Sequence, residues 1–176
     1  MTDAPHERQH AHVDAGFCVT GLAPRIAIVV VGATGSLLLI PAPFSFIAVV
    51  FALLGAVLPT SLGTWIAAAL IGFAQLARTP DASDWRPYAA LAGVHLLHVI
   101  GSLTLVVDPF GRMQLRVFAR PLRRWILIQL PAQAALAIVL LIEASHGIHP
   151  GVLSGLFAIV AAVALGVIAV LIIRRR

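Results

Sequence analysis

The sequence predicts an all-α protein, a polytopic transmembrane helical bundle of six spans, with five spans as the alternative. Of its 176 residues, 60% are hydrophobic and only 11% are charged, whereas soluble domains carry roughly 25% charged residues. Long charge-free runs alternate with short segments that hold arginines. This composition excludes an ordinary soluble domain and a disordered chain. Because Cys18 is the only cysteine, it also excludes a disulfide-stapled scaffold.

The chain begins with a polar segment, residues 1–24, which is expected to be a disordered tail ahead of a single transmembrane domain at 25–176. Asp3, Glu7 and Asp14 lie in this segment and make it a poor start for a signal peptide. The first span is therefore expected to be an uncleaved anchor. The three histidines of this tail lie on no predicted helix or strand, so they do not indicate a metal site.

The first apolar stretch, Ile26–Ala77, contains 52 residues without a charge, although one crossing needs only about 20. Prolines near residues 42 and 59 mark two places where a helix would break, since proline resists helix interiors. Division there predicts three short spans, near 24–40, 43–58 and 62–77. The rival division is two long tilted helices, one of them kinked.

Three further spans follow, near 87–107, 125–142 and 152–173. The segment before the fifth span and the C-terminus carry eight of the twelve arginines, and the connection at 143–151 carries none. Because positive charges favour the cytoplasmic side, the C-terminus and this arginine segment are predicted to be cytoplasmic. Six spans would also make the N-terminus cytoplasmic and place ten arginines inside, against eight for five spans.

The connection near 110–120 predicts a short amphipathic helix lying in the membrane interface, ended by Pro121. Its arginines recur every four residues and would reach anionic lipid phosphate. A docking surface for an acidic cytosolic partner is the alternative, and no motif indicates nucleic acid. The basic residues of this loop that would face lipid or a partner are Arg112, Arg116, Arg120, Arg123 and Arg124.

Five polar residues fall inside the predicted spans and form a candidate intramembrane cluster. Polar groups in hydrocarbon need a partner or a function. Counting about 14 Å inward from Asp108 and from Arg124, at 1.5 Å per residue, brings His98 level with Gln133. Counting fewer residues from the same two starting points also matches Ser102 with Gln129. Hydrogen bonds between helices are the favoured interpretation of the cluster of His95, His98, Ser102, Gln129 and Gln133, with a ligand or transport site as the alternative.

Catalytic and cofactor chemistry find little support in this pattern. His95 and His98 share one helix face, so they cannot ligate one haem iron from both sides. No acid lies within a span to complete a metal site or a proton relay, and no known catalytic motif occurs. We therefore expect no catalytic, cofactor-binding or metal-binding residues, although the sequence leaves enzymatic activity open.

The predicted last span begins with a ridge of small residues that would permit close helix packing. Such ridges let two backbones approach in lipid, where association depends on packing rather than on hydrophobicity. The contact could be made within the chain, with a second copy or with another membrane protein. The ridge consists of Gly151, Gly155, Ala158, Ala162 and Gly166.

The stretch from His95 and His98 through the Arg116, Arg120, Arg123 and Arg124 loop resembles small multi-span integral membrane proteins of mycobacteria and other actinobacteria, whose activity is not established. The resemblance covers about residues 85–145 and is mostly compositional. It implies an accessory membrane component of the bacterial inner membrane and assigns no catalytic residue.

Together these observations predict an integral inner-membrane protein that is a structural or interaction component of a larger assembly. The alternative is a small transporter or channel subunit with a midplane polar site. The expected partners are the lipid bilayer and a membrane protein or a second copy of the chain.

Overall fold

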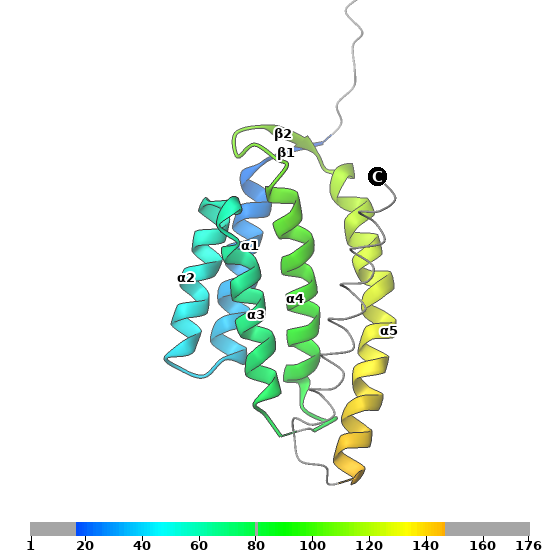
Figure 1. The fold of residues 1–176 in the computed structure, drawn as a ribbon. Helices are drawn as coiled ribbons and strands as arrows, with labels where there is room; N and C mark the ends of the chain where they lie inside the picture. The colour runs from blue at the N-terminus through cyan, green and yellow to red at the C-terminus, as the bar shows by residue number, and fades with distance from the viewer. Residues whose placement is uncertain (1–16, 80, 147–176) are drawn as a thin grey trace, which may run out of the picture.

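A computed structural model describes residues 17–79 and 81–146 of the chain and is mostly helical. In this described part, four antiparallel helices form a bundle and a fifth, longer helix lies beside the fourth (Figure 1). Two short strands meet at one end of the bundle. The helices are α1 (Leu22–Leu39), α2 (Phe44–Val57), α3 (Gly63–Leu76), α4 (Trp85–Thr104) and α5 (Arg116–His146).

The long charge-free stretch folds into three helices, which confirms the three-part division over two long helices. α1 stops at Leu39 because Ile40, which precedes Pro41, takes an extended backbone (φ −114°, ψ 132°), as residues before proline prefer. Between α2 and α3 the chain makes a 3₁₀ turn, Pro59–Ser61. Leu62 then reverses its direction with a left-handed backbone (φ 59°).

The helices differ in length. α2 and α3 have 14 residues each, about 21 Å at 1.5 Å per residue, which is less than the roughly 30 Å of a bilayer core. Within the described residues, three helices are long and apolar enough to cross a membrane, namely α1, α4 and Arg116–Ser145 of α5. Six spans are thus not supported, and the predicted span at 152–173 lies outside the described residues.

The prediction of an interfacial helix near 110–120 is wrong. The chain turns at Asp108–Gly111 and then forms strand β2 (Arg112–Gln114), which pairs antiparallel with β1 (Cys18–Thr20). Val19 lies opposite Met113. Two short strands far apart in sequence thus satisfy each other's backbone groups, which the local arginine period did not indicate.

Pro121 does not end a helix, contrary to the expectation. α5 begins at Arg116 and runs through Pro121 and Pro131 without a break. Pro121 lies in its second turn, where the missing N–H deprives only the carbonyl of Val117. Val117 is 47% exposed at the start of the helix, so solvent can supply the partner.

Residues 17–24, assigned to the polar tail from the sequence, form β1 and the start of α1. The pairing of β1 with β2 brings the N-terminal side of α1 to the same end of the bundle as the arginine-containing segment. We call this the arginine-rich end. Four α-helices lie between the two strands in the sequence. Because this number is even, the chain returns to the end of the bundle at which it started, where the strands can pair.

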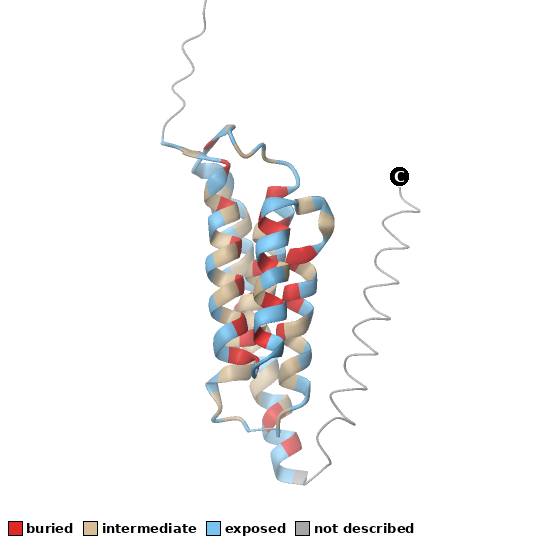
Figure 2. Ribbon diagram, turned by 90° about the vertical axis from the view of Figure 1, so that its left-hand side faces the viewer, coloured by how far each residue is buried: buried red, intermediate tan, exposed pale blue. Residues whose placement is uncertain are grey.

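The core lies between α1, α2, α3 and α4 (Figure 2). Ile28, Ile71 and Leu97 are fully or almost fully buried. The other buried positions between these helices are mostly alanines and glycines, whose small size lets α2 lie very close to α3. α5 contacts this unit mainly along α4 and leaves large apolar side chains such as Leu130 (68%) exposed.

Candidate functional site

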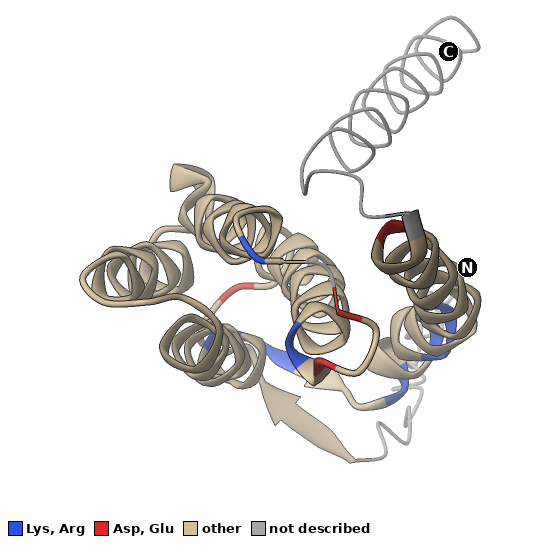
Figure 3. Ribbon diagram, turned by 90° about the horizontal axis from the view of Figure 1, so that it is seen from below, with Lys and Arg blue, Asp and Glu red and all other residues tan. Residues whose placement is uncertain are grey.

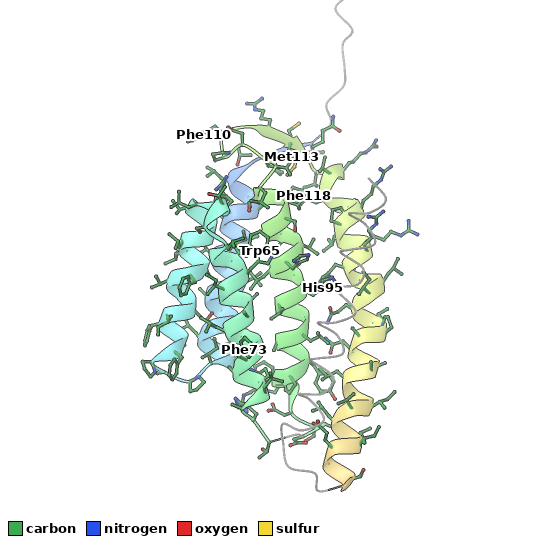
Figure 4. The ribbon with its side chains drawn as sticks, in the orientation of Figure 1. Trp65, Phe73, His95, Phe110, Met113 and Phe118 are labelled. Carbon is green, nitrogen blue, oxygen red and sulfur yellow. The ribbon has the colours of Figure 1, made fainter. Side chains whose placement is uncertain are left out.

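The polar residues predicted inside the helices gather where α4 faces α5, in a strip that we call the α4–α5 seam. His95 lies near the middle of α4 and points towards α5 (Figure 4). From α5, Gln129 reaches this position because it is on the face turned towards α4, where it is 7% exposed. The seam consists of Tyr88 and His95 from α4, and Trp125, Gln129 and Gln133 from α5.

His95 and Gln129 form the central contact of the seam. The Nδ1 atom of His95 lies 3.1 Å from Oε1 of Gln129. Because an amide oxygen only accepts, this arrangement places a proton on Nδ1 of His95. The amide nitrogen of Gln129 is then buried without a hydrogen-bond partner among the described residues. The contact therefore satisfies one end of the amide and leaves the other end open.

Gln133 and Trp125 extend the seam one helical turn in each direction from Gln129. Nε2 of Gln133 donates to the carbonyl of Tyr88 at 2.9 Å. The ring of Trp125 lies 6.4 Å from that of His95 at a 48° tilt. Oε1 of Gln133 and Nε1 of Trp125 are buried without a partner in the described part of the chain.

His98 belongs to a different contact. Its Nδ1 accepts a hydrogen bond of 3.1 Å from Nε1 of Trp65 on α3, and the two rings meet edge to face. Trp65 is thus directed from α3 towards α4 (Figure 4). The hydroxyl of Ser102 donates to the backbone carbonyl of His98 at 2.8 Å. His98 and Ser102 are exposed on the bundle surface.

The predicted pairs His98–Gln133 and Ser102–Gln129 are therefore wrong, although a His–Gln contact between the same two helices is present. The depth count assumed that α5 begins near Arg124. It begins at Arg116, about eight residues earlier. That difference slides α5 along α4 and brings Gln129 level with His95.

Two polar side chains that sequence reasoning missed cap the ends of neighbouring helices. Arg25 on α1 donates from Nη1 to the carbonyl of Ala56 in the last turn of α2, at 2.7 Å. Gln75 on α3 donates to the carbonyl of Leu39, the last residue of α1, at 3.1 Å. Terminal carbonyls lack helical partners, and apolar surroundings make them costly. Polar residues at the borders of apolar runs were the available signal.

Charged residues lie near helix ends and in connections, and the described ribbons carry few of them (Figure 3). At the end opposite the arginine-rich end, Asp84 caps α4 and lies 3.8 Å from Arg78 and 3.7 Å from Arg86. Hydrogen bonds from the side chain and backbone of Ser83 hold the pKa of Asp81 below its usual value. The five arginines predicted for a basic loop lie on β2 and on the first three turns of α5. All five are exposed.

No group of three His, Cys, Asp or Glu side chains that could hold a metal ion occurs in residues 17–79 and 81–146. The seam contains one histidine and two amides, which are donors and acceptors suited to helix contacts. The predicted small-residue ridge, Gly151 to Gly166, lies outside the described residues.

Comparisons of the chain with protein-family models, with curated proteins and with solved structures find no match. The geometry defines a helical bundle with a fifth helix attached through polar contacts.

Proposed function

We propose that the chain is an integral protein of the bacterial inner membrane and a structural or interaction component of a larger membrane assembly. The three long apolar helices support the membrane location. The observation that carries the functional proposal is that His95, His98, Gln129 and Gln133 each bond to a side chain or carbonyl of a neighbouring helix. Side chains used in this way stabilise contacts between helices.

In this proposal the segment 152–173 is the last span, so that both termini lie at the arginine-rich end. The arginine-rich end carries Arg25 and the five exposed arginines of β2 and α5, whereas the opposite end carries Arg78 and Arg86. The positive-inside rule therefore places the arginine-rich end in the cytoplasm, with the N- and C-termini. The exposed arginines of α5 would contact anionic lipid there.

The outer face of α5 is the proposed site of contact with a partner protein or a second copy. Leu127, Leu130, Ile138 and Leu141 are spaced by three, eight and three residues, so they share one face of the helix. They are 58–68% exposed. The same face carries Arg120 and Arg123 towards the arginine-rich end, and it is turned away from Gln129, the residue of α5 that contacts His95 of α4.

Photocrosslinking in cells tests this face. A benzoylphenylalanine at Leu130 or Leu141 is expected to give discrete products heavier than the chain, of twice its mass if the partner is a second copy. The control positions are Phe46 and Val50 on α2, which are equally exposed (62% and 60%) and should give only lipid adducts. Equal products at both faces, or none at α5, would contradict the proposal.

A second candidate function, a small transporter or channel subunit, is favoured by one observation. Trp125, Gln129 and Gln133 each hold a buried polar atom without a partner among the described residues. These atoms recur every four residues along α5 and could line a polar path. A transporter would lose transport, rather than helix attachment, when they are replaced.

A further inference from the structure

A pocket of about 350 Å³ opens at the arginine-rich end, away from the α4–α5 seam. Three segments form it: the first turn of α1, the turn between α2 and α3, and the chain that follows α4. The β1–β2 pairing holds the first and third of these segments together. Its lining includes Arg25, Pro59, Thr60, Leu105 and Asp108.

Arg25 lines this pocket, and only Nη1 of its guanidinium has a hydrogen-bond partner among the described residues. Its Nη1 is fixed by the carbonyl of Ala56, so the guanidinium cannot swing away without uncapping α2. Its Nε is buried and has no hydrogen-bond partner among the described residues. A guanidinium has five N–H donors in a rigid fork, which suits the oxygens of a phosphate.

Asp108 supplies the opposite charge in the same pocket. The backbone N–H of Phe110 donates to its Oδ1 at 2.8 Å, and the N–H of Gly111 donates to its carbonyl at 3.1 Å. A side chain on Gly21 would collide with that carbonyl, so the close approach of α1 fixes Asp108 further. Yet no ion pair within 4.0 Å joins Arg25 to any carboxylate of the described chain. The two charges share a pocket without neutralising each other.

We propose that this pocket binds the zwitterionic headgroup of a phospholipid, with the phosphate at Arg25 and a primary ammonium at Asp108. Thr60 also lines the pocket, and its hydroxyl would donate to the phosphate. A ligand with only a negative charge would be attracted by Arg25 and repelled by Asp108, whereas an ammonium–phosphate pair is attracted by both. Pro59 and Leu105 provide apolar walls for the glycerol end of a lipid.

This inference rests on the proposed membrane location, because that location brings the arginine-rich end to the level of the headgroups. The shared chemistry, phosphate beside ammonium, also occurs in soluble phosphoethanolamine. A lipid is favoured because the pocket lies at the end of apolar helices.

The test measures which lipid the purified full-length chain retains. Protein in detergent is incubated with equal amounts of phosphatidylethanolamine and phosphatidylglycerol, and bound lipid is counted by native mass spectrometry. The wild type is expected to retain phosphatidylethanolamine about fivefold better, the ratio that ~1 kcal/mol for a partly exposed charge pair corresponds to. Phosphoethanolamine at millimolar concentration should displace it only weakly.

The decisive variant is Asp108→Asn, which keeps an oxygen for the N–H of Phe110 and removes the charge. It should still bind lipid but lose the fivefold preference, because phosphatidylglycerol is no longer repelled. The matched control, Asp81→Asn at the opposite end, should keep the wild-type ratio. A wild type without preference, an unchanged ratio in Asp108→Asn or the same change in both variants would overturn the proposal. Full displacement of phosphatidylethanolamine by phosphoethanolamine would contradict the proposal that the pocket binds a lipid.

Failure of this test can be distinguished from failure of the membrane proposal. Alkaline carbonate extraction of cell membranes reports whether the chain is integral, independently of any headgroup preference. A chain that resists extraction and shows no preference refutes the pocket alone.

Discussion

Replacing Gly55 with alanine is expected to separate α2 from α3 and lower the melting temperature in detergent by roughly 6–12 °C, the shift that ~3 kcal/mol produces in a chain of this size. A Cβ at Gly55 would overlap the backbone nitrogen and the hydroxyl of Thr64. These atoms belong to the first turn of α3 and cannot yield as a flexible side chain could. Overpacking of this kind usually costs about 1–3 kcal/mol, and more against backbone.

The matched control is Gly72→Ala on α3. A Cβ there meets nothing within 4 Å, and alanine favours helix over glycine by about 1 kcal/mol. The melting temperature of Gly72→Ala should therefore stay equal to that of the wild type or rise. A similar loss in both variants would contradict this account, because a Cβ meets a neighbouring helix only at Gly55 of these two positions.

Removing one partner of the His95–Gln129 contact is expected to destabilise the attachment of α5 more than removing both. His95→Leu leaves the buried amide oxygen of Gln129 without its hydrogen-bond donor, which costs about 1–3 kcal/mol. In the double variant His95→Leu/Gln129→Leu the orphaned amide is gone, so the two losses are less than additive. A coupling of about 0.6–2 kcal/mol is expected, the range for hydrogen bonds between membrane helices.

Thermal unfolding of the four proteins of this double-mutant cycle gives the coupling. The control cycle pairs His98→Leu with Gln129→Leu, because His98 bonds to Trp65 instead. Its losses should add within about 0.5 kcal/mol, as expected for residues without a shared contact. Additive losses in the first cycle as well would mean that the seam contact does not hold α5.

Much of the helical part of the fold could be predicted from the sequence because its signals are local. Pro41 and Pro59 mark breaks that sterics impose wherever they occur, and the three helices over 22–76 follow from them. The start of α5 could not be predicted in the same way. It depends on pairing between Val19 and Met113, which are far apart in sequence.

The polar site was predictable in kind but not in detail. A histidine and a glutamine within apolar runs indicate a polar contact between helices, and His95 and Gln129 form one. Which residues meet depends on how far α5 slides along α4, which the start of α5 at Arg116 determines. Arg25 was missed because its role, capping Ala56 of another helix, arises only when α1 and α2 are packed together.

The most direct test of the central claim, that the polar residues between the apolar helices join those helices and line no aqueous passage, is paired cysteine chemistry on a Cys18→Ser background. The pair His95→Cys/Gln129→Cys should crosslink within membranes, whereas His98→Cys/Gln133→Cys should not. Neither cysteine of the first pair should react with a membrane-impermeant maleimide from either side. Maleimide labelling of both, without a crosslink between them, would contradict the claim and favour a transport path.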